Sequence, residues 1–218
     1  QLQKELKQRR QELEAAAEQL SSERKAQALQ LEKAIETELK DLNFAEVQFQ
    51  IHFDKLADYT ADGVDDVEFL ISMNPGQPVK PLAEVASGGE LSRTMLAIKT
   101  VMADRDEIET LIFDEIDVGI SGRTAQKVSE KMAVIGRNHQ VICITHLAQI
   151  AAQADQHYLI EKTVDGGVTR TEIRKLSEEE SIDELARILG GAEITETVRM
   201  SAREMKSMVK SNAVKNKK

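Results

Sequence analysis

The first 42 residues contain neither glycine nor proline, and this stretch restricts the possible fold more than any other part of the chain. It is rich in Glu, Gln, Lys, Ala and Leu, which are all good helix formers. Leu6, Leu13 and Leu20 recur along it every seven residues, and Leu2 lies four residues before Leu6. Because this seam is narrow and the other faces are charged, the pattern predicts one strand of a coiled coil.

A second apolar stripe in the same segment is out of register with the first. It consists of Leu31, Ile35, Leu39 and Leu42. The shift predicts a stutter in the coiled coil, and the alternative is a long amphipathic helix lying on the globular part. No later segment carries matching heptads, so a missing part or another chain has to supply the partner helix. The chain begins at Gln1 rather than Met, and we therefore expect a fragment.

The composition of the 218-residue chain argues against a strongly basic nucleic-acid surface, an internal disulfide and a membrane span. Its net charge of -9 gives no overall electrostatic footprint for nucleic acid. Cys143 is the only cysteine, which rules out an internal disulfide, and its apolar neighbours predict a small core residue. No secretory signal and no apolar stretch of membrane-spanning length occurs. We expect a cytoplasmic, nucleoid-associated protein without membrane contact.

The apolar period changes after the first helix. Two segments alternate between apolar and polar residues, and the segment between them is turn-prone, which predicts an antiparallel hairpin. The alternating segments are 44–53 and 67–71, and the turn is 58–63. All three prolines then fall in one loop, between positions 75 and 81.

Helices and strands alternate in the rest of the chain. Two short apolar strands joined by a helix predict a βαβ unit, and therefore an α/β fold. The expected elements are a helix over 91–103, strands over 110–113 and 141–145, a helix over 125–135 and a hairpin over 158–176 turning at 165–167. Ser177 and Glu180 form a capping box that opens a further helix. We expect a coiled-coil arm over 1–43, a globular lobe over 44–210 and a basic flexible tail over 211–218.

Two acids, Asp114 and Glu115, come directly after the strand over 110–113. They are therefore placed at the carboxyl edge of a parallel sheet, where α/β proteins bind ligands. In phosphoryl-transfer sites, an acid at this position can hold magnesium and its neighbour can polarise the attacking water. The alternative is a pair of solvated acids in a turn.

The run Ser87-Gly88-Gly89-Glu90 precedes the helix over 91–103. Ser87 and Glu90 have capping-box spacing, so the run can be no more than a helix start. A cap does not require two adjacent glycines, however, and these let a ligand approach the backbone closely. A glycine-lined helix N-terminus is also a favourable anion site.

Two further segments lie next to the acids. Thr145-His146 directly follows the second apolar strand, where the histidine can contact a phosphate, although such a histidine is more often structural. The loop from Asp117 to Gly122 precedes a helix. We expect this loop to lie beside a nucleotide and to face a second subunit.

These four segments, in this order, resemble the C-terminal half of an ABC ATPase domain, where they are the signature motif, Walker B, D-loop and H-loop. The match covers about 60 residues and is specific because four elements agree in order. Ala86 departs from the usual leucine, and Glu90 replaces the glutamine typical of transporters. Together with the coiled coil, the pattern resembles the SMC-like ABC ATPases of bacterial DNA repair. The resemblance implies the C-terminal lobe of an ABC-type P-loop ATPase head with an N-terminal coiled-coil helix.

The resemblance also implies ATP and Mg²⁺ as cofactors and a role for each site residue. Glu115 and His146 are the implied catalytic residues, and Asp114 would hold Mg²⁺ through water. A second head's ATP would be contacted in trans by Ser87, Gly88, Gly89, Glu90 and Asp117. The chain has no Gly-Lys pair and so no phosphate-binding loop. The resemblance implies that the N-terminal half of the same protein supplies this loop and the second coiled-coil strand.

The implied function is ATP hydrolysis in recombinational repair of DNA double-strand breaks, by a homodimer joined through ATP-bound heads. DNA ends are the implied partner, and the fragment alone is expected to be inactive. One alternative is the nucleotide-binding subunit of an ABC transporter, which the coiled coil and Glu90 disfavour. The other is a non-catalytic coiled-coil scaffold, which the intact acids and His146 disfavour.

Overall fold

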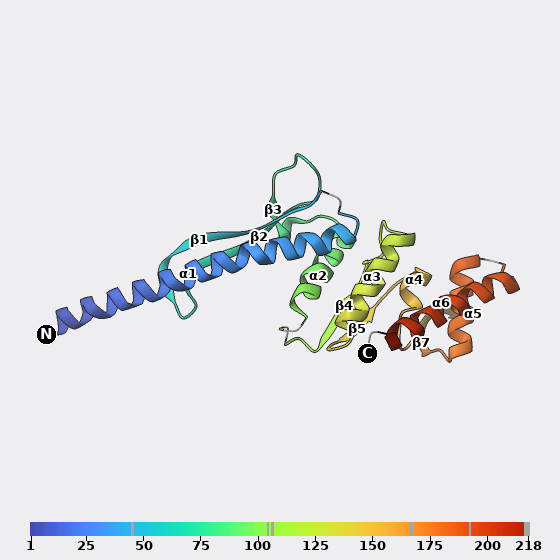
Figure 1. The fold of residues 1–218 in the computed structure, drawn as a ribbon. Helices are drawn as coiled ribbons and strands as arrows, with labels where there is room; N and C mark the ends of the chain where they lie inside the picture. The colour runs from blue at the N-terminus through green and yellow to red at the C-terminus, as the bar shows by residue number, and fades with distance from the viewer. Residues whose placement is uncertain (45, 104, 106, 166–167, 192, 216–218) are drawn as a thin grey trace. The chain divides into compact units, whose positions relative to one another are not determined.

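The computed structural model describes residues 1–44, 46–103, 105, 107–165, 168–191 and 193–215. The chain divides into two compact units, Gln1–Asp106 and Glu107–Lys218. The first contains α1 (Leu2–Asp41), β1 (Gln48–Thr60), β2 (Gly63–Ser72), β3 (Lys80–Pro81), a 3-10 turn (Leu82–Glu84) and α2 (Gly88–Met102) (Figure 1). The second contains β4 (Thr110–Phe113), α3 (Gly122–Ile135), β5 (Gln140–Cys143), α4 (Ala148–Ala151), β6 (Tyr158–Asp165), β7 (Val168–Lys175), α5 (Glu178–Gly190) and α6 (Glu196–Lys215).

The long helix α1 ends in a Schellman motif. Asn43 takes a left-handed conformation with φ 74°, which asparagine tolerates better than most residues. The N–H of Phe44 donates to the carbonyl of Leu39 at 3.2 Å, and the N–H of Asn43 donates to that of Lys40 at 3.3 Å. Leu39 and Phe44 are both buried, as the hydrophobic contact of this motif requires. The chain therefore leaves the helix in a fixed direction.

The two apolar stripes of α1 have different surroundings. Ile35, Leu39 and Leu42 are fully buried and belong to the core of the first unit. The amphipathic-helix alternative therefore describes this end of α1. The leucines of the first stripe, from Leu2 to Leu20, are exposed. A coiled coil along the first stripe stays a prediction.

The predicted antiparallel hairpin is confirmed: β1 pairs with β2, with Phe49 opposite Ile71 and Phe53 opposite Val67. Both strands run further toward the turn than the sequence pattern indicates. Carboxylates of α1 cover the edge of β1: Glu36 Oε1 accepts from the N–H of Phe49 at 3.0 Å. Four residues of a helix rise about 6 Å and two residues of a strand rise about 6.8 Å. The same kind of contact can therefore form again four residues earlier in α1 and two residues later in β1. In this second contact, Glu32 Oε1 accepts from the N–H of Ile51 at 2.7 Å.

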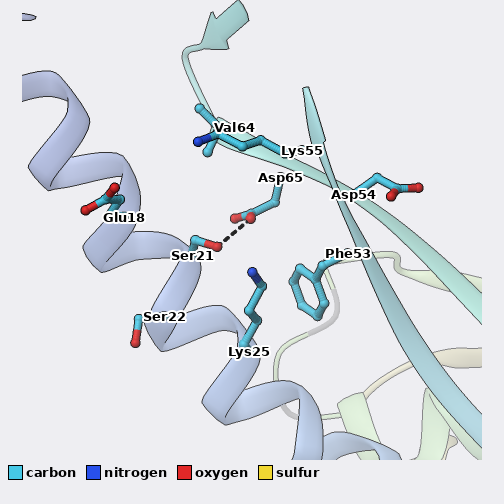
Figure 2. Close-up of a pocket in the computed structure, with 9 residues that line it drawn as sticks. All are labelled: Glu18, Ser21, Ser22, Lys25, Phe53, Asp54, Lys55, Val64 and Asp65. Atoms are coloured by element: carbon cyan, nitrogen blue, oxygen red, sulfur yellow. Dashed lines mark hydrogen bonds between the residues drawn. The ribbon is translucent and has the colours of Figure 1, made fainter. Parts of the chain in front are cut away.

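A second group of contacts holds the hairpin further along α1 (Figure 2). Ser21 Oγ donates to Asp65 Oδ1 at 2.6 Å, and Arg24 Nη1 lies 3.2 Å from Asp65 Oδ2. The hydrogen bond from Ser21 lowers the pKa of Asp65. Lys25 Nζ lies 5.8 Å from the centre of the Phe53 ring. Ser21, Lys25, Phe53 and Asp65 are among the residues that line a cavity of about 390 Å³ between helix and hairpin. The hairpin is therefore attached to α1 from Ser21 to Glu36.

The predicted βαβ unit is confirmed in the second unit. The strands β4 and β5 are parallel, with Phe113 opposite Cys143, and α3 connects them. The predicted apolar stripe of α3 is buried: Ala125, Val128, Met132 and Ile135. Only one face of the strands is covered, because Phe113 is buried whereas Ile112 is 68% exposed. Short apolar runs of this kind are typical of buried parallel strands, so the exposed face differs from what the sequence indicates.

Cys143 is only half-buried, so it is not the core residue that its apolar neighbours predict. Burial nevertheless raises the pKa of its thiol to about 12. The thiolate form, which is the nucleophile, is therefore scarce at neutral pH.

The helices α5 and α6 pack together at the C-terminal end, with Ile182, Leu185 and Ala202 in their shared core. The capping box of Ser177 and Glu180 opens α5 as predicted. The helix α6 continues to Lys215, five residues into the segment predicted as a flexible tail. Residues 216–218 and the turn residues 166–167 lie outside the described residues. None of the helices in the described ranges is long and apolar enough to cross a membrane.

A buried polar cluster joins α6 to α5, and it makes stability depend on pH. Lys206 Nζ donates to Ser181 Oγ, which lies 2.9 Å from His157 Nδ1. Burial, and then the charge of Lys206, lower the pKa of His157. The neutral imidazole is thus favoured in the folded chain. Its contribution to stability is present above the unfolded pKa of about 6.5 and is lost as pH falls through the lower folded pKa.

We therefore expect mild acid to lower the melting temperature by a few degrees more in the wild-type chain than in His157→Gln, which cannot gain this charge. Thermal unfolding followed by circular dichroism between neutral pH and about pH 5 measures the difference. His52→Gln is the matched control, because His52 is exposed on β1. Equal acid sensitivity of the wild type and His157→Gln would contradict the assignment.

Candidate functional site

The carboxyl ends of β4 and β5 lie side by side, and most of the predicted site residues follow them. The N–H of Ile144 donates to the carbonyl of Phe113 at 3.0 Å, so the two strands end together. Asp114 and Glu115 follow β4, and Thr145 and His146 follow β5 shortly after. The second unit thus brings together four predicted residues: Asp114, Glu115, Asp117 and His146.

The acid pair occupies a strained turn. Glu115 has a φ of 56°, a left-handed conformation that is uncommon for a residue with a side chain. Its N–H donates to Asp114 Oδ1 at 2.8 Å, and its carbonyl accepts from the N–H of Val118 at 3.1 Å. Such a conformation costs about 1–3 kcal/mol and is found preferentially at functional sites. Both acids are exposed, as a role toward a ligand requires.

Asp117 organises the segment that carries the histidine. Its Oδ2 accepts from the hydroxyl of Thr145 at 2.5 Å and from the N–H of His146 at 2.8 Å. The same oxygen lies 3.0 Å from His146 Nδ1. The Asp117 side chain is 4% exposed, whereas that of His146 is 72% exposed. The resemblance implies that Asp117 contacts ATP of a second head; in the structure of the single chain, its carboxylate is buried and accepts from Thr145 and His146.

The loop between Asp117 and α3 contains two glycines in left-handed conformations. Gly119 has φ 75° and Gly122 has φ 50°, and side chains at either position would be strained. Val118, which lies between Asp117 and Gly119, is half exposed. Glycine is therefore needed here for the path of the loop, which keeps Asp117 below the surface and Val118 on it.

The Ser87–Glu90 run lies in the first unit, where it begins α2. Ser87 Oγ accepts from the N–H of Glu90 at 3.4 Å, which is long for a hydrogen bond. The capping interpretation is thus correct, but the cap is weak. Gly88 is exposed and Gly89 is buried. The first N–H groups of a helix lack intrahelical partners, so this exposed end retains the properties of an anion site.

A buried arginine in α2 was not singled out by the sequence pattern. Arg93 lies over the Phe44 ring at 5.3 Å from its centre, and burial lowers the pKa of its guanidinium. The contact ties α2 to the residue that follows the end of α1. An arginine that follows a glycine-rich helix start would ordinarily be taken for a surface charge. Arg93 is buried because it packs against Phe44, which is distant in sequence.

The residues present fit a magnesium ion that is held mainly by other ligands. Among the described residues, no three His, Cys, Asp or Glu side chains converge as a complete metal site. Mg²⁺ is commonly bound by one or two carboxylates, with water and substrate phosphates completing its octahedron. The exposed carboxylate of Asp114 is suited to this partial role.

Comparison with known proteins gives consistent relatives, although no family model matches the chain. The chain is 44% identical over 209 residues to the DNA repair protein RecN of Halalkalibacterium halodurans, covering 94% of this chain and 37% of the relative. It is 43% identical over 192 residues to RecN of Vibrio cholerae, covering 88% of this chain and 35% of the relative. The chain therefore spans about a third of the length of these relatives.

A solved structure shows the fold. The chain is similar to the Smc head domain with a coiled coil and joint derived from Pyrococcus yayanosii, with a TM-score of 0.51 and 24% sequence identity. The match covers 74% of this chain and 29% of the Smc chain. The predicted fold, part of an ABC-type ATPase head of the SMC kind, is thereby confirmed. With 39–47% identity to several RecN proteins over most of its length, the chain belongs to the RecN family, of which it is a segment.

Proposed function

We propose that the whole protein is an ATP-hydrolysing, SMC-like protein of recombinational DNA double-strand break repair, and that this chain carries its acid pair and histidine. The observation that carries the proposal is the exposed pair Asp114 and Glu115 beside His146, at the carboxyl edge of two parallel strands. Membership of the RecN family supports the role in DNA repair. The similarity to DNA repair proteins also disfavours the transporter alternative.

Each site residue has a proposed role. Asp114 holds Mg²⁺ through water, and the ion, when bound, neutralises charge that develops on the phosphates. Glu115 accepts a proton from the attacking water, which its exposed carboxylate can do without rearrangement. His146 presents Nε2 to the γ-phosphate, because Nδ1 faces Asp117.

The remaining parts of the site come from outside this chain. The N-terminal half of the same protein supplies the phosphate-binding loop and the second coiled-coil strand, and the exposed leucine seam of α1 supports the latter. In a homodimer, the N-terminus of α2 contacts ATP of the opposing head through Ser87, Gly88, Gly89 and Glu90. DNA ends are the proposed partner of the whole protein, which would place it with the nucleoid.

The isolated chain should bind ATP weakly and hydrolyse none, because the loop that provides most of the phosphate contacts is absent. The full-length protein should hydrolyse ATP, and faster with double-stranded DNA. Calorimetric titration of the chain and a phosphate-release assay of the full-length protein measure both. Tight ATP binding by the chain would contradict the divided site, and an inactive full-length protein would favour the scaffold alternative.

A further inference from the structure

We propose that Asp117 is a positioning residue that orients His146 within the same head, rather than a contact to the nucleotide of a second head. This inference rests on the proposed ATPase function. It assigns to the first residue of the D-loop the task of holding the histidine of the H-loop. Asp117 and His146 lie 29 positions apart in the sequence, and the contact forms because β4 and β5 are neighbours.

The carboxylate of Asp117 is directed toward groups of its own chain. Three groups converge on Asp117 Oδ2: the hydroxyl of Thr145, the backbone N–H of His146 and the ring nitrogen Nδ1 of His146. A buried carboxylate requires such donors, because an unpaired charge in this position is strongly unfavourable. Turning Asp117 outward toward another subunit would break all three contacts together. The arrangement therefore favours an inward role.

The contact decides which nitrogen of His146 meets the substrate. With Nδ1 directed at Asp117 Oδ2, the proton on that nitrogen is fixed by the carboxylate, and Nε2 is on the exposed side of the ring. A ring oriented in this way presents Nε2, rather than Nδ1, toward a phosphate.

The backbone is held by the same residue. Thr145 Oγ donates to Asp117 and accepts from the N–H of Leu147 at 3.0 Å, so hydrogen bonds brace the chain on both sides of His146. Asp117 is also two positions after Glu115, in the loop that follows the strained turn. The proposed general base and the histidine are thus connected through one short segment, which keeps their separation constant.

A double-mutant cycle in the full-length protein tests the proposal. Asp117→Asn should lower kcat about 10- to 100-fold, because a misplaced reacting group has an effect of this size. The KM for ATP should change by less than about twofold, since the residue does not contact the nucleotide. His146→Ala should have a similar effect on kcat. Asp117→Asn should then cost nothing further in the His146→Ala background, because Asp117 acts through the ring.

Nitrogen-15 NMR of the His146 ring gives a second readout that requires no variant. In the wild-type full-length protein, the proton should be on Nδ1, and Asp117→Asn should shift the ring toward the other tautomer. An unprotonated Nδ1 in the wild type would overturn the proposal even if the variant failed to fold. So would independent effects of the two substitutions on kcat, or loss of ATP-driven dimerisation in Asp117→Asn with an unchanged ring. A wild type without ATPase activity would count against the proposed function, while the ring measurement would still decide the role of Asp117.

Discussion

In the full-length protein, Glu115→Gln should keep ATP bound while turnover falls by about 100-fold or more, the range expected when a general base is lost. The amide has nearly the same shape as the carboxylate but cannot take a proton from water. The side chain is exposed, so the substitution leaves no buried group without a partner. The backbone contacts of the turn, from the N–H to Asp114 and from the carbonyl to Val118, do not involve the side chain.

ATP-bound heads should therefore accumulate as dimers in this variant. Single-turnover hydrolysis measures the chemical step, and size-exclusion chromatography with ATP measures the dimer. Asp114→Asn is the matched comparison, because its amide oxygen can still accept from the N–H of Glu115 and preserve the turn. We expect it to weaken nucleotide binding as well, since the charge facing Mg²⁺ is lost. Wild-type turnover in Glu115→Gln would show that another group accepts the proton.

Features with a local physical cause could be predicted from the sequence. The antiparallel hairpin of β1 and β2 follows from alternating apolar residues, and the capping box of Ser177 and Glu180 follows from side chains three positions apart. The parallel pair β4 and β5 could be predicted because short apolar strands separated by a helix have few other arrangements. The order of the four site segments was informative because it resembles that of a known family.

Features that depend on distant neighbours could not be predicted. Ile112 lies in an apolar run that predicts burial, but it is exposed in the structure. The second stripe of α1 is shifted from the first, and the sequence left open whether it continues the coiled coil or packs on the globular part. It packs into the core because the hairpin returns along the helix. For Asp117, residue type and position in the loop indicate an exposed contact, and only the neighbouring strand shows which donors it meets.

The second large effect is expected for Ser87→Arg, which should leave ATP binding by each head nearly intact but abolish head dimerisation and hydrolysis. Ser87 begins α2, and Gly88 beside it is exposed, so a phosphate of an opposing head can approach the backbone closely. Arginine adds bulk at this point of approach. Its positive charge favours phosphate, but the steric effect should dominate because the glycines leave space only for direct contact.

Helix capping provides the matched control. The Ser87 cap is weak, with 3.4 Å between Oγ and the N–H of Glu90, and losing a cap costs about 1 kcal/mol. Ser177 caps α5 more completely, because the Glu180 carboxylate also accepts from its N–H at 2.8 Å. Ser177→Arg should therefore destabilise the protein at least as much as Ser87→Arg, as measured by urea unfolding, and yet retain hydrolysis. If both substitutions reduce turnover equally, capping rather than contact with ATP explains the effect of Ser87→Arg.

Mixed dimers then locate the action of Ser87 in the opposing head. A Ser87→Arg subunit is paired with a subunit whose phosphate-binding loop is inactivated, using two affinity tags to isolate the hybrid. Both lesions fall in one composite site, and the other site receives an intact loop from one head and an intact Ser87 from its partner. The hybrid should regain up to half of the wild-type activity, although neither parent homodimer has any. Full activity of the Ser87→Arg homodimer would exclude a role for Ser87 in trans. An inactive hybrid is less decisive, because strict coupling between the two sites and action of Ser87 within its own head both give that result.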